Sequence, residues 1–281
     1  MRAFASHYTR EQLRAVQGVL LISRPPPAAL APSPGQPTAV PSDPEEGEEI
    51  LLAVWDDGSV TGFAGHVDLG TGLRTALTQI VAEELSLATE KVAMVMGSTA
   101  SVPNQGSTIA SASLQIHAAP LRQAAAQAAA WLRSQGCVAA DTHTELTLDV
   151  TVATKPVADY SVVGQAVARV DIPAKAFGES IFVHDMRVPG MLHGRVVRPP
   201  YAGFDAGDFV GNTLERVDES SIAHIAGVVA IVVVRDFVGV VAEREDQAEA
   251  AMQALVVHWK PWPGMEGLDQ TENALRTNPA T

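Results

Sequence analysis

The chain of 281 residues has little of several residue types on which common protein classes depend. Cys137 is its only cysteine, which excludes a disulfide within the chain and a zinc or iron–sulfur site built from several of its own thiolates. Aromatic residues make up 5% of the sequence, and no apolar run approaches the ~20 residues that a membrane-spanning helix needs. Any redox centre must therefore come from outside the chain.

Positive charge is also scarce. Lysine and arginine number 19 against 32 acidic residues, which gives a formal net charge of -13. A surface of that sign repels phosphate backbones and anionic lipids, so nucleic acid is not expected as a partner. The hydrophobic share of 47% and the charged share of 18% exclude a wholly disordered chain. Because single cores stop growing near roughly 250 residues, the length predicts more than one domain.

The first 49 residues predict a tail followed by a linker. A helix is expected around residues 10–21, but the order of parts in a secretory signal peptide is missing. We therefore expect a cytoplasmic protein that reaches a membrane only through a partner. Prolines and then a cluster of glutamates fill residues 24–49. Proline removes amide donors and the acids repel one another, so this segment is predicted to be extended or disordered.

Residues 50–154 predict a first domain that contains a hairpin, a helix, a strand and a second helix. The Asp-Asp-Gly sequence at 56–58 favours a tight turn. An apolar stripe predicts a helix over 71–85 with Thr71 as its N-cap, and an alanine-rich segment predicts a helix over 113–133. Strands are expected at 51–55, 60–67, 92–96 and 145–152.

Shorter strands separated by glycine and proline predict a second, mixed domain over residues 155–263. Its one expected helix covers 243–255, and the tail at 264–281 carries no pattern. Strands are expected at 161–163, 180–183, 191–197, 228–234, 237–242 and 255–259. The order of these elements predicts an α+β fold.

Two segments that precede predicted helices are the best candidates for a ligand site. Residues 65–72, GHVDLGTG, are rich in glycine, and residues 102–113, VPNQGSTIASAS, are rich in small and hydroxyl side chains. Such loops let the backbone approach a ligand, and helix-start amides favour an anion or a polarised oxygen. A tight turn with a threonine cap and an ordinary capped loop are the simpler interpretations. Neither segment matches a GxGxxG or GK[ST] nucleotide motif, and two such loops suggest one shared site.

Other chemically active residues give weaker signals. Glu83 and Glu84 are interpreted as the solvated face of a helix, and Cys137 is expected to pack rather than to act as a nucleophile. A stand-alone enzyme that uses His184 and His193 stays open as a further hypothesis. The histidines lack HxxxH or HxH spacing, so no protein metal site is expected and each is interpreted as a surface or hydrogen-bonded residue. The seven histidines that follow His7 are His66, His117, His143, His184, His193, His224 and His258.

Three blocks of sequence follow one another along the chain: GHVDLGTGLRTALTQIVAEEL at 65–85, VPNQGSTIASASLQ at 102–115 and VGQAVARVDIPAKAFGESIFVHDMRVPGMLHGRVVRPP at 163–200. In this order they resemble the molybdopterin-binding subunit of the xanthine dehydrogenase and aldehyde oxidase family. The resemblance is strongest to the branch with the large subunits of nicotinate dehydrogenase and isoquinoline 1-oxidoreductase. The third block, continued through 227–259, is similar to the a/b hammerhead domain of that family.

The resemblance implies a partial molybdopterin-binding domain at 50–154 and a hammerhead domain at 155–263. It implies an oxidoreductase that binds molybdopterin cytosine dinucleotide with molybdenum and hydroxylates an N-heteroaromatic compound or an aldehyde with oxygen from water. Electrons then pass to a small subunit with two [2Fe-2S] clusters and, in this branch, to a cytochrome c subunit. The cofactor contacts of the family fall on Leu69, Gly70, Thr71, Ile109, Ala110 and Ser111.

Some positions depart from the family pattern. Many relatives have glutamine at the position of Thr71, and an acidic residue is usual at the position of Ser98. The glycine-rich loop that faces molybdenum and the catalytic glutamate have no counterpart before Thr281, so no catalytic residue is identified. A truncated reading frame, a subunit whose C-terminal half is encoded separately and a relic are the open explanations. The alternative function is a non-catalytic module that docks iron–sulfur or maturation partners.

Overall fold

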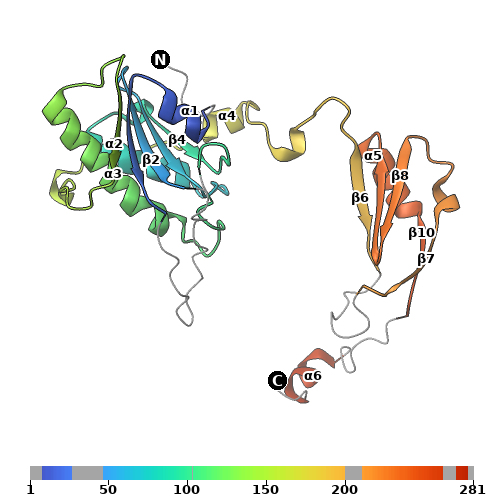
Figure 1. Cartoon of the computed structure of the whole chain (residues 1–281). Helices are drawn as coiled ribbons and strands as arrows, with labels where there is room; N and C mark the ends of the chain where they lie inside the picture. The colour runs from blue at the N-terminus through green and yellow to red at the C-terminus, as the bar shows by residue number, and fades with distance from the viewer. Residues whose placement is uncertain (1–7, 27–46, 103, 200–210, 262–269, 278–281) are drawn as a thin grey trace. The chain divides into compact units, whose positions relative to one another are not determined.

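A computed structural model describes residues 8–26, 47–102, 104–199, 211–261 and 270–277. The chain divides into two units, Met1–Ser180 and Ile181–Thr281 (Figure 1). Residues 155–180 belong to the first unit, although the sequence pattern changes already at residue 155. Most of the linker expected at 24–49 lies outside the described residues, so its extended state stays a prediction. No helix within the described ranges is long and apolar enough to cross a bilayer.

The first unit contains a five-stranded sheet. Its strands are β1 (Val19–Arg24), β2 (Glu49–Trp55), β3 (Val60–Ala64), β4 (Val92–Met96) and β5 (His143–Thr147). They are ordered β4-β3-β2-β1-β5. β2 is antiparallel to both β1 and β3, whereas the outer pairs β3–β4 and β1–β5 are parallel. The predicted hairpin is therefore confirmed as β2 and β3.

The prediction of a helix over residues 10–21 is wrong beyond its first half. Helix α1 (Arg10–Ala15) ends at the extended residue Val16, and two positions later Gly18 has a φ of 74°, which no α-helix contains. The next four residues are fully buried in β1, and their side chains alternate between two separate cores. The periodicity of such a short apolar run does not distinguish a helix face from a strand that is buried on both sides.

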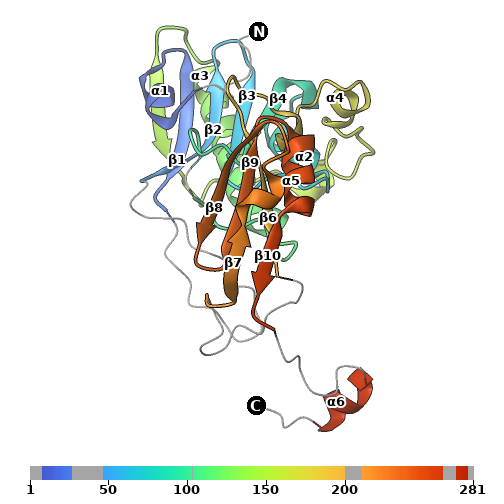
Figure 2. The ribbon, with the colours of Figure 1, turned by 90° about the vertical axis from the view of Figure 1, so that its right-hand side faces the viewer.

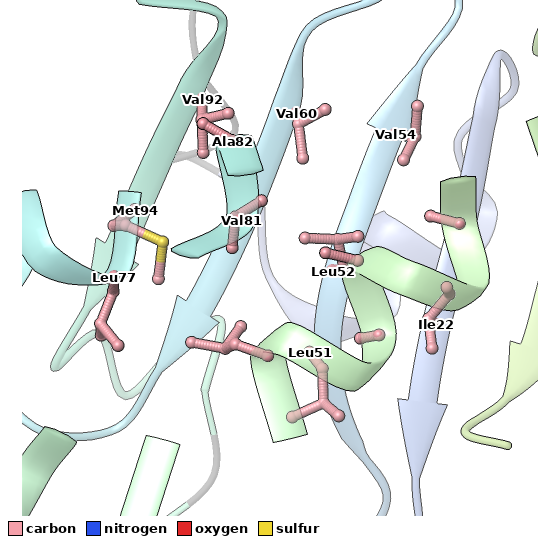
Figure 3. Packing of buried hydrophobic residues seen from close by; sticks show 14 of the residues in the cluster. Ile22, Leu51, Leu52, Val54, Val60, Leu77, Val81, Ala82, Val92 and Met94 are labelled. Carbon is pink, nitrogen blue, oxygen red and sulfur yellow. The ribbon is translucent and has the colours of Figure 1, made fainter. Parts of the chain in front are cut away.

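Helices cover both faces of this sheet. α2 (Leu73–Leu85) and α3 (Ser113–Gln135) pack on one face, and α1 packs on the other. Figure 3 shows Leu77 and Val81 of α2 in the same core as Leu52 of β2. Full burial of one such aliphatic side chain contributes about 1.5–3 kcal/mol. The two helices predicted here are confirmed, and their amphipathic stripes are the faces that bury against the strands.

The second unit has a smaller core. Strands β6 (His193–Val197), β8 (Val228–Val234) and β9 (Phe237–Ala242) form an antiparallel sheet in the order β6-β9-β8 (Figure 2). Strands β7 (Leu214–Asp218) and β10 (Val256–Trp259) form a separate antiparallel pair. Helix α5 (Glu245–Ala254) packs against β6 and β9. The core holds Ile222, Val238, Val240, Ala251 and Leu255.

Several predicted elements need correction. Residues 161–163 and 180–183 form no strand, and the backbone amides of 161–163 donate to a glutamate side chain instead of a neighbouring strand. The strand expected at 145–152 begins earlier and ends at Thr147. β7 was not predicted, and helix α6 (Thr271–Thr277) occupies the tail expected to lack a pattern. The strands expected at 228–234 and 237–242 are confirmed as β8 and β9.

Short helical segments complete the described chain. Helix α4 (Ile172–Ala176) lies near the end of the first unit and begins with a proline in its first turn, where the missing amide hydrogen costs nothing. The 3₁₀ turns cover Thr89–Lys91, Val157–Asp159, Val183–Asp185 and Glu219–Ile222. Assignment of residues 155–263 to the hammerhead domain stays a prediction.

Candidate functional site

The two loops singled out in the sequence line one cleft in the first unit. Its volume is about 440 Å³. The first loop and the start of α2 contribute Val67, Leu69, Thr71, Gly72, Leu73 and Ala76. The second loop and the start of α3 contribute Thr108, Ile109, Ala110, Ser111, Ser113 and Leu114. Five of the six residues expected at a cofactor therefore face the same cleft, and Gly70 lies between two of them.

Asp68 organises the first loop. Its Oδ1 accepts hydrogen bonds from the amides of Gly70 at 2.9 Å and Gly72 at 3.2 Å, and its Oδ2 accepts one from Arg74 at 2.9 Å. Desolvation raises the pKa of Asp68, but these amide donors outweigh it and leave the pKa below its usual value. The prediction that Thr71 caps α2 is wrong, because Asp68 binds the helix-start amides and Gly72 occupies the cap position.

This arrangement also limits which backbone donors face the cleft. The amides of Gly70, Gly72 and Arg74 are used by Asp68, so the expectation that the glycine-rich loop leaves its helix-start amides free is wrong for these three. Positive φ angles at the two glycines, 94° and 81°, allow the loop to wrap around the carboxylate. Asp68 was missed in the sequence because it lies six positions before the most distant amide that it binds.

The second loop is held in an unusual conformation. Ala110 and Ser111 have φ angles of 56° and 54°, in the left-handed region that costs non-glycine residues on the order of 1–3 kcal/mol each. Contacts with the first loop support it: Gln105 Oε1 accepts from the amide of Gly65 at 2.6 Å, and Thr108 Oγ1 accepts from that of Val67 at 3.1 Å. The two loops therefore hold each other in place. No acceptor among the described residues binds the amides of Ala110 and Ser111.

Arg169 fixes the first loop from a distant part of the chain. Its Nη1 donates to the carbonyl oxygen of Gly70 at 2.8 Å, and its Nε and Nη2 donate to Asp171 at 3.0 and 2.7 Å. Hydrogen bonds from Arg169 and then Lys175 hold the pKa of Asp171 well below its usual value. The next residue, Val170, donates its amide to Thr75 of α2 at 3.0 Å. A charged cluster thus clamps the loop that forms one wall of the cleft.

Glu83 and Glu84 do not form a solvated helix face, so that interpretation is wrong. They are 1% and 6% exposed. Glu83 Oε2 accepts from the amides of residues 161–163 at 2.6–2.9 Å, and its Oε1 accepts from Lys155 Nζ at 2.9 Å. Desolvation opposes ionisation, but Lys155 and the three amides lower the pKa of Glu83 to about 2. Arg122 Nε donates to Glu84 at 2.6 Å.

Two histidines are buried next to the cleft. His66 and His117 are 1% and 2% exposed, with ring centroids 4.6 Å apart and an interplanar angle of 84°. Nδ1 of His66 lies 2.8 Å from Oγ of Ser113, which lines the cleft. Burial lowers the pKa of His66 against a smaller opposing effect of the Gln105 backbone. Burial, followed by His66 and Arg24, lowers the pKa of His117 to about 4.

Sequence spacing did not predict this histidine pair, because its two members are brought together only by the packing of α3. Within the described ranges no cluster of three or more His, Cys, Asp or Glu side chains is placed to hold a metal ion. His184 is exposed and does not line the cleft. The expectation that Cys137 packs is wrong, since it is exposed after the turn at Gly136, whose φ is 88°.

Several known proteins are similar to this chain in sequence. The chain matches the molybdopterin cofactor-binding domain over residues 29–182. It is 50% identical to a nicotinate dehydrogenase subunit of Pseudomonas putida over 96% of this chain and 25% of that protein. It is 30% identical to the beta subunit of isoquinoline 1-oxidoreductase of Brevundimonas diminuta over 42% of this chain and 14% of that protein. A probable xanthine dehydrogenase subunit of Bacillus subtilis is 42% identical over 21% of this chain and 8% of that protein.

These matches confirm the resemblance of the three sequence blocks. The chain spans about a quarter of the length of the first of these relatives. The matched domain includes both loops of the cleft, the helices that follow them, and Arg169, which donates a hydrogen bond to the first loop. The chain therefore belongs to the xanthine dehydrogenase family of molybdenum hydroxylases and carries its molybdopterin cofactor-binding domain.

Proposed function

We propose that the cleft between the two loops binds the molybdenum cofactor, in its molybdopterin cytosine dinucleotide form, and that Leu69, Gly70, Thr71, Ile109, Ala110 and Ser111 form the contact surface. The observation that carries this proposal is the convergence of two helix starts. Leu73 begins α2, Ser113 begins α3, and both residues line the same cleft. The positive end of the α3 dipole favours an anionic group there, and molybdopterin carries a phosphate; the start of α2 shapes one wall, because Asp68 already binds its amides.

The side chains of the cleft suit a flat, polar-edged ring system. Leu69 and Ile109 are 69% and 52% exposed and offer apolar surface to a heteroaromatic ring. Thr71, Thr108 and Ser111 supply hydroxyl groups that both donate and accept hydrogen bonds. The amides of Ala110 and Ser111 add two donors that find no acceptor in the described part of the chain. Asp68 and Arg169 act one step away by keeping the first loop in shape.

When bound, this cofactor supplies molybdenum for hydroxylation with oxygen from water and for removal of electrons from the substrate. The residues of this chain bind and orient it, and the apolar side chains at the mouth exclude water from one side. We propose an N-heteroaromatic compound or an aldehyde as the substrate class. The names of two relatives, a nicotinate dehydrogenase and an isoquinoline 1-oxidoreductase, support the first of these.

The same two relatives are named as subunits, which supports a multi-subunit enzyme. We propose that electrons leave through a small subunit with two [2Fe-2S] clusters and then a cytochrome c subunit. We propose that the remaining part of the enzyme supplies the catalytic glutamate of the family; this chain matches 25% of the length of the nicotinate dehydrogenase subunit.

Cofactor content tests the proposal. The full chain would be produced in a host that makes molybdopterin cytosine dinucleotide, and molybdenum and oxidised pterin would be measured per chain. Ala76→Trp fills the cleft from α2, and Ala139→Phe places a similar bulk on an exposed turn. We expect cofactor in the wild type and in Ala139→Phe and none in Ala76→Trp. Chains without cofactor in all three forms, or equal loading in all three, would contradict the proposal.

A further inference from the structure

Ser113, the first residue of α3, borders the cleft and also contacts His66. Ser113 is partly exposed and lines the cleft, and its Oγ lies 2.8 Å from Nδ1 of His66. His66 comes from the first loop, 47 positions earlier in the chain. A hydroxyl group has one hydrogen and two lone pairs, so one contact with His66 leaves it able to bind a ligand as well. Ser113 was not among the residues expected to touch the cofactor.

The environment of His66 limits the role that the hydroxyl can play. His66 is 1% exposed, and its Nε2 has no partner at hydrogen-bond distance among the described residues; the backbone of Gln105 interacts with the ring and raises its pKa by less than burial lowers it. If Ser113 donated to Nδ1, the neutral ring would carry its hydrogen on Nε2, as a buried donor without an acceptor. If Nδ1 carries the hydrogen, Nε2 is a bare acceptor instead. Among buried backbone groups, N–H groups without an acceptor are rarer than under-satisfied carbonyl oxygens, and the same preference applied to the ring favours the second arrangement.

Burial favours the neutral form of His66, because desolvation lowers the pKa of its ring. His117, 2% exposed, packs against it at 4.6 Å between centroids, and its own Nε2 also lacks a partner in the described part of the chain. Two positive charges at that distance in a buried site would repel strongly. A neutral His66 with hydrogen on Nδ1 must donate to Ser113, and the hydroxyl hydrogen then points away from the ring.

We infer that His66 donates from Nδ1 to Oγ of Ser113, and that the Ser113 hydroxyl thereby becomes a fixed hydrogen-bond donor to an anionic or carbonyl oxygen of the ligand in the cleft. Ser113 is then a further binding residue, and His66 is a positioning residue. The start of α3 then offers three hydrogen-bond donors to a ligand: the hydroxyl of Ser113 and the amides of Ala110 and Ser111. The inference rests on the proposed function only for the identity of the ligand.

The tautomer is tested without any ligand. Nitrogen-15 NMR of the full chain, with His66→Asn used to assign the signal, reports which ring nitrogen of His66 carries hydrogen. We expect hydrogen on Nδ1 and a bare Nε2. Hydrogen on Nε2, or a doubly protonated ring at pH 7, would overturn the inference whether or not the chain binds the cofactor.

Cofactor loading tests the second half. Under limiting cofactor, Ser113→Ala should carry about three- to tenfold less molybdenum per chain, the effect of losing one hydrogen bond. Ser134→Ala, at an exposed position outside the cleft, should load like the wild type. His66→Leu should lose cofactor as Ser113→Ala does, whereas His66→Asn, whose amide can donate from the position of Nδ1, should restore it. Wild-type loading in Ser113→Ala would refute Ser113 as a binding residue and leave the proposed function standing.

Discussion

Strands β2 and β8 both consist mainly of apolar residues but differ strongly in burial. β2, EILLAVW, is buried at every position, whereas β8, VVAIVVV, has no residue classed as buried. β2 is the central strand of the first unit's sheet, with helices on both faces. β8 is an edge strand of a three-stranded sheet whose helix packs on β6 and β9. An apolar run therefore predicts a strand, but the position of the strand in its sheet decides how much of it is covered.

Polar anchors differ between the units in the same way. Glu83 in the first unit is buried and binds one lysine and three backbone amides. In the second unit Glu249 pairs with Arg195 at 2.8 Å, but its side chain is 42% exposed. Water screens the second pair and not the first, so the same chemical change should have unequal effects on the two units.

The largest effect is expected from Glu83→Gln. The neutral amide places an N–H₂ group among four donors and leaves Lys155 without its charge partner, which should lower the free energy of unfolding of the first unit by about 3–5 kcal/mol. Glu249→Gln is the matched control in the second unit and should change its stability by no measurable amount. Urea-dependent hydrogen exchange, read separately for peptides of each unit, measures both. Equal effects in the two units would remove the distinction between these anchors.

Substitutions of apolar residues should also lower the free energy of unfolding of the two units unequally, by a somewhat smaller difference. Leu52, 0% exposed in β2, leaves a cavity when changed to alanine, and the free energy of unfolding of the first unit should fall by about 3 kcal/mol. Val232, 39% exposed in β8, should cost the second unit less than about 0.5 kcal/mol when changed to alanine. Urea-dependent hydrogen exchange, read separately for peptides of each unit, measures both effects. A cost at Val232 near that at Leu52 would mean that β8 is covered in solution.

Acid should weaken the first unit through its buried histidines. The pKa of His117 falls from 6.5 to about 4 on folding, so the unfolded state binds more protons between these values. The free energy of unfolding of the first unit should therefore decrease as pH falls from about 6.5 to 4, by on the order of 2–3 kcal/mol. The described histidines of the second unit are all partly or fully exposed.

The variant His117→Gln isolates this contribution. Its unfolding free energy should depend less on pH over that window than that of the wild type, since the titrating ring is gone while His66 remains. Denaturation curves at several pH values between 4 and 7 give the comparison. Parallel curves for wild type and variant would show that His117 titrates alike in the folded and unfolded chain.

Local patterns predicted much of the fold. The sequences of α2, α3, β8 and β9 determine their structure through periodicity and continuous apolar runs, which need no distant partner. β1 was missed because its sequence is short and fits a helix face as well as a buried strand. Residues 161–163 were expected to form a strand because nothing near them in the sequence reveals that their amides bind Glu83.

The candidate site also contains residues that the local sequence predicts and residues that depend on distant contacts. The loops at 65–72 and 102–113 were recognisable because glycine and hydroxyl residues before helix starts have a local meaning. Asp68, Arg169 and the pair of His66 with Ser113 were not, since each acts through a partner set by tertiary packing. Side chains that shape a site are harder to predict than those that face it, because their function depends on long-range contacts.

The most direct test compares backbone amide NMR spectra of the full chain with and without bound molybdopterin cytosine dinucleotide. The account predicts that amides in residues 69–73 and in residues 108–113 shift together, because both loops line one cleft. Amides of β8 and β9 should stay in place. Shifts confined to one loop, or centred in the second unit, would contradict the shared cofactor site.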